Sequence, residues 1–370
     1  MLAEQIRDAV HQTLDELVST EAYRRYTGDY SSALADRLSA EFADARVLLT
    51  SSGTAAIEIA LRAAGVGQGD VVVLSGFDYP GNFWAIERCG ARPLLVDIER
   101  DGWNLSMDSL KDVATSGQNV KALVVSHLYG QLQPMLALRE WCDHLGWLLV
   151  EDSCQSLGAS IGEIPVGTVG HFGIASFGGG KVLSAGRGGC LISSTESLMA
   201  KAHVAAGAGS GPYGLSELQA AMVLAQLPFL RSINETCTKF FSALNSQLVR
   251  LCPVPHPAHS CPSMDPIGKS HSCSQAYYQL GWLASESLAK RLDEFIALLT
   301  QYGLAVGRGF PGFHRRSDRR CTRLGELPHT ILAAERTWVM HHSQALAGSF
   351  SPADVAQIMA DAVIECTESS

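Results

Sequence analysis

Four groups of residues in this chain could act together on a small molecule. Asp152 and Lys181 each follow a short apolar run that is typical of a buried strand, and three glycines precede Lys181. Ser52-Gly53-Thr54 stands before a helical pattern, and Tyr79 follows another apolar run. In open α/β sheets, ligands bind beyond the carboxyl ends of the strands. We therefore expect these groups to meet at one edge of a sheet.

Together these groups could supply what pyridoxal phosphate requires from a protein. A helix that begins with small residues offers free backbone N–H groups to a phosphate. The Asp152 carboxylate could keep the pyridine nitrogen protonated, and the Tyr79 ring could stack on the cofactor. Lys181 could form a Schiff base and move protons, provided that the pKa of its ammonium is lowered. Each feature alone is commonly structural, but their combination predicts a pyridoxal phosphate site with Lys181 and Asp152 as catalytic residues.

Two short motifs point to other chemistry but lack the required context. Residues 158–162 fit GxSxG, yet Pro165 follows and no helix can be predicted there, as a hydrolase elbow would need. Residues 209–214 fit GxGxxG but follow a helical stretch instead of a strand. We predict that both are turns.

A zinc site is the other alternative that the sequence raises. The Pro- and Ser-rich segment 252–274 contains Cys252, Cys261, Cys273, His256, His259 and His271. Their spacing fits no usual zinc pattern, so we predict a loop there and no metal. The ten cysteines form no CxxC pair, and the first 20 residues lack the apolar stretch of a signal peptide. These features favour reduced thiols in a cytoplasmic protein.

Alternating strands and helices are predicted to position the site between residues 50 and 195. Continuous apolar runs flanked by helices indicate strands that are buried on both faces, hence a mainly parallel α/β sheet. The predicted strands are 71–74, 93–98, 122–126, 147–152, 173–177 and 190–194, and the helices between them are 55–65, 82–90 and 134–146.

The pattern changes after Gly211. Residues 215–248 predict two helices with a break at Pro228, and residues 285–303 and 351–368 predict further helices. We predict a large domain over residues 1–240, which begins with an amphipathic helix over 1–20, and a smaller α+β domain over residues 241–370.

The composition excludes several classes of protein. The chain has 370 residues, of which 46% are hydrophobic and 18% charged, so it is neither disordered nor fibrous. Its formal net charge of -9 disfavours a nucleic-acid partner. No apolar run approaches the roughly 20 residues of a membrane helix.

Several motifs together resemble those of the DegT/DnrJ/EryC1/StrS family of pyridoxal-phosphate sugar aminotransferases. They are SSGTAAIEIALRAAGVGQGD, VSHLYGQ, VEDSCQSLGA, SFGGGK, GRGG and SELQAAMVLAQL, in this order. The resemblance implies a type I, aspartate aminotransferase-like fold with a mainly parallel seven-stranded sheet. It also implies a homodimer with active sites at the subunit interface.

The resemblance also assigns roles to residues by their position in these motifs. Lys181 matches the Schiff-base lysine, and Asp152 matches the partner of the pyridinium nitrogen. His127 is expected to have a structural role. The cofactor-binding residues implied are Gly53, Thr54, Tyr79, Asp152, Gln155, Ser176 and Lys181.

Three departures from the family pattern concern the substrate more than the cofactor. Residues 178–180 are all glycine where the family has an aromatic-Pro-Thr triplet or similar. Arg187 replaces a common glutamate, and we expect it to contact an anionic group. Pro212 replaces the asparagine that reaches the partner subunit's cofactor phosphate, and proline has no side-chain donor for that contact.

We therefore expect an aminotransferase that moves an amino group from glutamine or glutamate to a ketosugar or a cyclitol ketone, in a secondary-metabolite or cell-surface sugar pathway. A dehydratase or another elimination or replacement enzyme on the same fold remains an alternative, as does a relative without catalytic activity. The run Arg315–Arg320 could bind a phosphate-bearing substrate or form a solvated surface.

Overall fold

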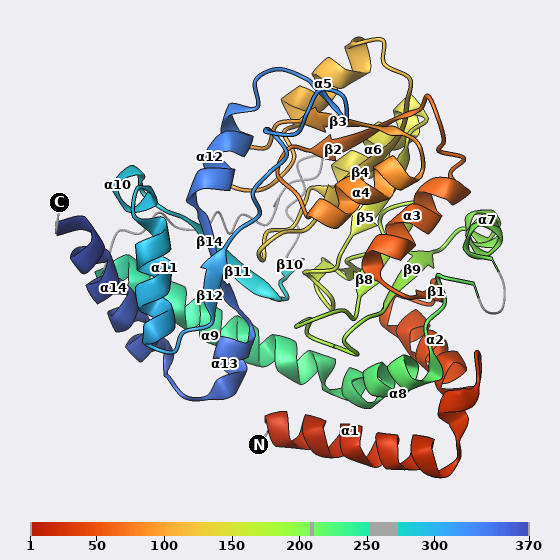
Figure 1. Cartoon of the computed structure of the whole chain (residues 1–370), viewed down its shortest axis with the longest axis horizontal. Helices are drawn as coiled ribbons and strands as arrows, with labels where there is room; N and C mark the ends of the chain where they lie inside the picture. Colours follow the sequence, from red (N-terminus) through yellow and green to blue (C-terminus); the bar gives the residue numbers. More distant parts are fainter. Residues whose placement is uncertain (1, 208–210, 252–272, 369–370) are drawn as a thin grey trace.

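The computed structural model describes residues 2–207, 211–251 and 273–368. Its central feature is an eight-stranded sheet in the order β1-β9-β8-β5-β4-β2-β3-β13 (Figure 1). The strands are β1 (Arg46–Thr50), β9 (Gly189–Ser193), β8 (Phe172–Ser176), β5 (Leu148–Asp152), β4 (Val120–Ser126), β2 (Val71–Ser75), β3 (Arg92–Val96) and β13 (Thr322–Arg323).

The sheet is mainly parallel, as predicted. β9 is antiparallel to both of its neighbours, and the pairs from β8 to β13 are all parallel. The difference from the expected seven strands is β13, a two-residue strand from the C-terminal part of the chain that pairs with the edge strand β3.

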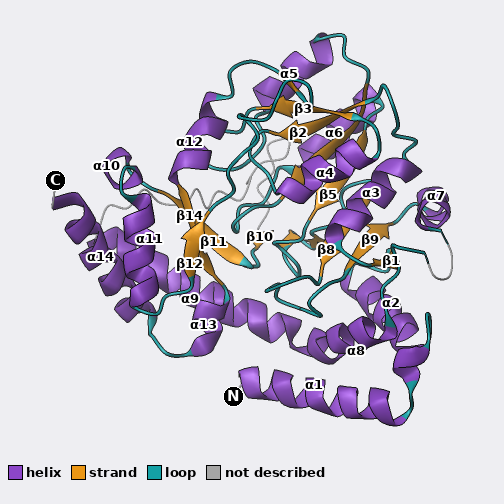
Figure 2. Ribbon diagram, viewed as in Figure 1, coloured by secondary structure: helices purple, strands orange, loops and turns teal. Residues whose placement is uncertain are grey.

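Helices cover both faces of the sheet (Figures 1 and 2). In β2, Val72 and Leu74 pack with α3 (Gly53–Ala63), α4 (Pro80–Arg88) and α7 (Glu196–Ala206), whereas Val71 and Val73 pack toward α5 (Met107–Thr115) and α6 (Met135–Leu145). Successive residues of a strand point to opposite faces, so the continuous apolar run VVVL follows from burial on both sides.

A second group of elements lies at the C-terminal side of the chain. A three-stranded antiparallel sheet has the order β11 (Gln279–Leu283), β14 (Thr337–His341), β12 (Val306–Arg308). It shares a core with α9 (Leu230–Leu251), α11 (Leu292–Gln301) and α14 (Pro352–Glu368). α9 passes through the predicted boundary at residue 240 and leads from α8 (Glu217–Gln226) to this group (Figure 1).

The remaining elements complete the chain. They are α1 (Leu2–Ser19), α2 (Asp29–Glu41), α10 (Glu286–Ala289), α12 (Pro328–Arg336), α13 (Ser343–Ala347), β6 (Ser160–Ile161), β7 (Ile164–Pro165), β10 (Cys273–Ser274) and the 3-10 helices Ala22–Arg24 and Leu227–Phe229. The 3-10 turn at Leu227–Phe229 contains Pro228, which confirms the predicted break between two helices.

The structure also bears on the other sequence motifs. The GxSxG match lies at the short antiparallel pair β6–β7, with no strand-to-helix elbow. The GxGxxG match lies partly outside the described residues, as does nearly all of the segment 252–274. Seven cysteines are free thiols, but Cys273 is disulfide-bonded, so the prediction of reduced thiols is wrong there. Within the described residues, no helix is long and apolar enough to cross a membrane.

Candidate active site

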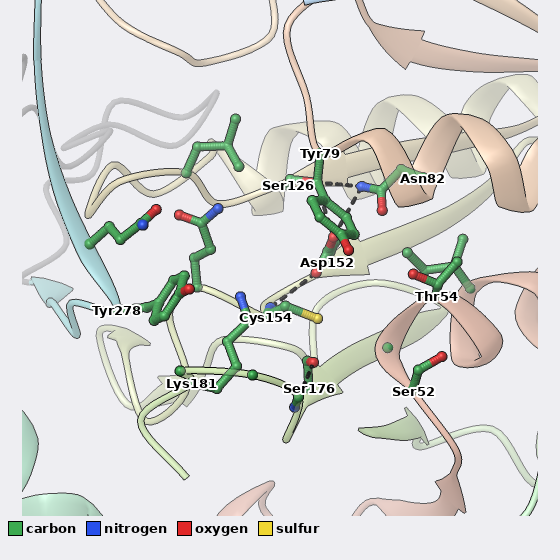
Figure 3. Close-up of a pocket in the computed structure, with 18 of the residues that line it drawn as sticks. Ser52, Thr54, Tyr79, Asn82, Ser126, Asp152, Cys154, Ser176, Lys181 and Tyr278 are labelled. Atoms are coloured by element: carbon green, nitrogen blue, oxygen red, sulfur yellow. Dashed lines mark hydrogen bonds between the residues drawn. The ribbon is translucent and has the colours of Figure 1, made fainter. Parts of the chain in front are cut away.

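The predicted site residues line one cavity of about 390 Å³ at the carboxyl ends of the parallel strands. Ser126, Asp152 and Ser176 are the last residues of β4, β5 and β8, and all three contribute to its wall. Figure 3 shows the labelled side chains converging on this space. The predicted residues brought together there are Gly53, Thr54, Tyr79, Asp152, Gln155, Ser176, Lys181 and Arg187.

The N-terminus of α3 forms one end of the cavity. Ser52 caps the helix, because its side chain accepts the Ala55 N–H at 3.0 Å. The hydrogen-bond ladder of the helix begins with the Ala56 N–H, which donates to the Ser52 carbonyl oxygen, so the N–H groups of Gly53 and Thr54 precede the ladder. Free N–H groups at a helix start, together with the helix dipole, favour an anion.

Gly53 is required by the close approach of two neighbouring side chains. A Cβ atom at this position would lie 3.0 Å from Cys154 Sγ and 3.1 Å from Ser176 Cβ. A larger residue would therefore displace the helix start from the wall that Ser176 forms. The glycine keeps the backbone N–H groups close to the Ser176 hydroxyl.

Asp152 is buried and held by neutral donors. Its Oδ1 accepts the Cys154 N–H at 3.0 Å, and its Oδ2 accepts from Asn82 Nδ2 at 3.0 Å and from the Ser126 hydroxyl at 3.3 Å. Only 4% of the residue is exposed. These hydrogen bonds fix the carboxylate at the cavity without neutralising it, which leaves its charge available to a cationic group of a ligand.

Lys181 lies on a glycine-rich loop between β8 and β9. Gly179 (φ 54°) and Gly186 (φ 73°) adopt left-handed backbone conformations that favour glycine, and a β-bridge joins them. Gln226 of α8 clamps the loop, since its side-chain amide accepts the Ser184 N–H at 3.1 Å and donates to the Ser184 carbonyl oxygen at 2.8 Å. The backbone of the loop is thus fixed independently of the lysine side chain.

The C-terminal elements contribute to the position of Lys181. Its Nζ lies 3.9 Å from the centroid of the Tyr278 ring. His341 Nδ1 accepts the Ser343 N–H at 3.2 Å, so the proton is on Nε2, which lies 3.0 Å from the Gly180 carbonyl oxygen and donates to it. Burial lowers the pKa of Lys181, against the opposing effect of Cys154 and Asp152. A lowered pKa increases the fraction of free amine.

Aromatic side chains form another wall of the cavity. Tyr79 is the N-cap residue of α4, and its ring centroid lies 5.7 Å from that of Phe310. The Phe310 N–H in turn donates to the Tyr129 hydroxyl at 3.0 Å. Phe310 belongs to the segment that precedes β13, so the C-terminal part of the chain also closes this side of the site.

His127 and Gln155 are held by buried hydrogen bonds. His127 Nδ1 accepts the Gln133 N–H at 3.0 Å, so Nε2 carries the proton and donates to Glu151 Oε1 at 3.1 Å. Both nitrogens of this fully buried ring are therefore engaged. Gln155 Oε1 accepts the Tyr129 N–H at 3.2 Å.

The positions that depart from the family pattern differ in their surroundings. Arg187 is exposed and lines the cavity. Tyr213 ties its segment to the α3 region, because its carbonyl oxygen accepts the Ser51 N–H at 2.6 Å and its hydroxyl donates to Glu58 at 2.7 Å. The run Arg315–Arg320 contributes nothing to the cavity wall, and Arg320 pairs with Glu87 on α4.

Sequence reasoning missed five polar or aromatic residues that belong to this site. Asn82, Ser126, Tyr278 and Phe310 line the cavity, and Asp78 lies outside its wall but is hydrogen-bonded to Asn82. Ser126 ends a predicted strand and could have been found by the rule that identified Asp152. Tyr278 and Phe310 follow no pattern in the sequence that links them to residues 50–190. Metal-binding clusters of three or more His, Cys, Asp or Glu side chains are absent among the residues that the structure describes.

A family comparison matches nearly the whole chain. The sequence model described as the DegT/DnrJ/EryC1/StrS aminotransferase family covers residues 4–361.

Three curated relatives match shorter segments. GDP-perosamine synthase of Vibrio cholerae is 32% identical over 45% of this chain and 46% of its own length. A pleiotropic regulatory protein of Geobacillus stearothermophilus is 32% identical over 61% of this chain and 63% of its own. L-glutamine:2-deoxy-scyllo-inosose aminotransferase of Streptomyces kanamyceticus is 37% identical over 42% of this chain and 37% of its own. The matches thus span roughly half of these relatives' lengths.

Solved structures share the fold over almost the full chain. A DegT DnrJ EryC1 StrS aminotransferase from Brucella abortus superposes with a TM-score of 0.82 at 20% identity, covering 98% of this chain and 96% of that one. The structure of 3-amino-5-hydroxybenzoic acid synthase gives a TM-score of 0.82 at 22% identity, covering 97% of both chains.

Proposed function

This chain belongs to the DegT/DnrJ/EryC1/StrS aminotransferase family, and we propose that it transfers the amino group of glutamine or glutamate to the ketone of a sugar or cyclitol, with pyridoxal phosphate as cofactor. The observation that carries the proposal is that Lys181, Asp152 and the N-terminus of α3 line the same cavity. The names of two relatives support the substrate class, since one is an L-glutamine:2-deoxy-scyllo-inosose aminotransferase and another a GDP-perosamine synthase.

The residues of the cavity fit this cofactor. The close approach at Gly53 leaves a cradle that a Cβ atom would fill, beside the N–H groups of Gly53 and Thr54 and the Ser176 hydroxyl. These groups would hold the phosphate. Asp152 would face the pyridine nitrogen, Tyr79 would stack on the ring, and Gln155 would lie near its hydroxyl group. Lys181 would bond covalently to the aldehyde carbon.

The bound cofactor supplies an electron sink that stabilises negative charge on the substrate carbon. The Asp152 carboxylate, held by the neutral donors Cys154 N–H, Asn82 and Ser126, would favour the proton on the ring nitrogen. Lys181 Nζ takes the proton from the α-carbon of the amino donor as a general base, which its lowered pKa supports. The same atom returns a proton to the acceptor carbon when the ketone is aminated.

An absorbance experiment tests the proposed function. The purified protein, incubated with pyridoxal phosphate and freed from excess, should show a visible absorbance band that is lost on addition of glutamine or glutamate and restored by a ketosugar or cyclitol ketone. A bound cofactor that responds to neither amino acid would favour the elimination or replacement alternative. No bound cofactor would favour a non-enzymatic relative, an alternative that the name of the regulatory relative raises.

We further propose that the protein is a homodimer with active sites at the subunit interface, as the family resemblance implies. The domain boundary at residue 240 and the cytoplasmic location of the protein are further predictions.

We propose that Arg187 contacts an anionic group of the donor, the acceptor or the cofactor. Its guanidinium is exposed at the cavity, flanked by Gly186 and Gly188, and suits a carboxylate or a phosphate. Arg187→Gln should raise KM for the donor or the acceptor by on the order of tenfold, which is the size of one lost charged contact. Weaker retention of the cofactor would instead identify a phosphate contact.

Arg315→Gln is the matched control for this substitution. Arg315 is exposed and lies outside the cavity wall, so its loss should change neither KM nor cofactor retention. If Arg187→Gln changes only the melting temperature, Arg187 is a structural residue. If Arg315→Gln raises KM, the arginine run binds substrate after all.

A further inference from the structure

A second carboxyl group lies directly behind Asp152. Asp78 follows β2, and one amide group connects it to Asp152: Asn82 Nδ2 lies 3.2 Å from Asp78 Oδ1 and 3.0 Å from Asp152 Oδ2. Asp78 is 1% exposed and Asp152 is 4% exposed. Two buried carboxyl groups that share one neutral donor group cannot both carry a charge without a large electrostatic cost.

The available hydrogen bonds favour a charge on Asp152 over one on Asp78. Asp152 has donors at both oxygens, from Cys154 N, Asn82 and Ser126. Asp78 Oδ1 accepts the Tyr79 N–H at 2.6 Å, but its Oδ2 is buried and has no hydrogen-bond partner among the residues that the structure describes. A buried carboxylate oxygen without a donor is costly, whereas a protonated carboxyl needs fewer donors.

The donor count at Asn82 leads to the same conclusion. Its Nδ2 has two hydrogens but lies within hydrogen-bond distance of three acceptors, the third being Ser126 Oγ at 2.9 Å. One of the three must therefore go without a donated hydrogen. The distance from Asn82 Nδ2 to Asp78 is the longest of the three, so the hydrogen bond to Asp78 is the weakest. Asp78 therefore loses least from this donor when its carboxyl group is protonated.

The electrostatic surroundings agree with this geometry. Burial, and after it the charge of Asp152, raises the pKa of Asp78 to about 8, against the lowering effect of its hydrogen bonds. The titratable groups that face Asp78 are Asp152 at the end of β5 and the buried Tyr129 hydroxyl after β4. Neither is a cation that would stabilise a second negative charge.

We propose that Asp78 is a positioning residue of the site, which keeps its proton in the resting protein and, through Asn82, confines the negative charge to Asp152. The protonated Asp78 lets Asn82 donate to Asp152 instead of being shared between two carboxylates. The arrangement of these three residues concerns the chain alone, and only its consequence for the ring nitrogen rests on the proposed function.

Infrared spectroscopy of the purified full-length protein tests the proposal. At pH 6.5 the wild-type protein should show the C=O stretch of a protonated, buried carboxylic acid, and the band should disappear with a midpoint near pH 8. Asp78→Asn should remove the band. Asp97→Asn is the control, because Asp97 is also buried but accepts a backbone N–H at each oxygen, from His329 and Thr330. This control should leave the band in place.

The Asp152→Asn variant provides a second measurement should Asp78→Asn fail to fold. Removing the charge of Asp152 removes one cause of the raised pKa, so the band should persist but disappear at a lower pH than in the wild type. The proposal is overturned if the wild-type protein lacks the band at pH 6.5, if Asp78→Asn retains it, or if Asp152→Asn leaves its midpoint unchanged.

Thermal unfolding gives a readout that a merely structural role would not change. A carboxyl whose pKa is raised on folding contributes stability at low pH that is lost as the pH rises toward its folded value. The melting temperature of Asp78→Asn, relative to the wild type, should therefore increase between pH 5 and pH 8. A constant difference would contradict the proposal. None of these measurements requires turnover. A failure of this proposal can therefore be distinguished from a failure of the proposed aminotransferase activity.

Discussion

Lys181→Ala is expected to lower the rate of transamination by roughly 10⁴-fold or more, because it removes the amine to which the proposed function assigns both covalent attachment and proton transfer. Among the residues that line the described cavity, Lys181 is the only lysine. The fold should survive the change. Gln226, the bridge between Gly179 and Gly186, and His341 hold the loop through its backbone, and none of these contacts uses the lysine side chain.

Three measurements separate a catalytic role of Lys181 from a structural one. The variant should keep the circular dichroism spectrum and, within a few degrees, the melting temperature of the wild type, while the cofactor band shifts because no covalent bond forms. Lys201→Ala is the control, since Lys201 is exposed on α7 and lies outside the cavity. Transamination at the wild-type rate in Lys181→Ala would refute the whole site assignment.

The parts of this site that could be predicted from sequence lie at the ends of strands and at the start of a helix. Asp152 and Ser176 end buried strands, and Gly53 and Thr54 begin a helix that Ser52 caps, so each position follows from hydrophobic pattern and capping chemistry. The mainly parallel sheet follows from the same continuous apolar runs. A single pattern of this kind does not show which distant residues it will contact. Only the combination of the patterns indicated a common site.

The parts that could not be predicted depend on contacts between distant segments. Tyr278 reaches Lys181, and Phe310 reaches Tyr79, from the C-terminal part of the chain. β13 consists of only two residues, too few for a recognisable period, and its pairing with β3 is determined by tertiary packing. The role of Asn82 depends on two carboxyl groups, one after β2 and one at the end of β5, and no local pattern reveals that they meet.

Asp152→Asn is the second substitution with a large expected effect. The uncharged amide has nearly the size and shape of the carboxyl group, and its oxygen can still accept the Cys154 N–H. The protein should therefore fold and bind cofactor. We expect kcat to fall on the order of 100-fold, because the lost charge acts mainly in the transition state.

The comparison of Asp152→Asn with Asp78→Asn shows which carboxyl carries the charge. Both substitutions are nearly isosteric and affect groups that contact the same amide of Asn82. If Asp78 is protonated in the resting protein, Asp78→Asn removes no charge at pH 7 and should change kcat by less than about threefold. Equal losses in the two variants would mean that the charge is shared between the carboxyl groups. An unchanged kcat with weaker cofactor binding in Asp152→Asn would leave Asp152 a binding residue, with no part in protonating the ring nitrogen.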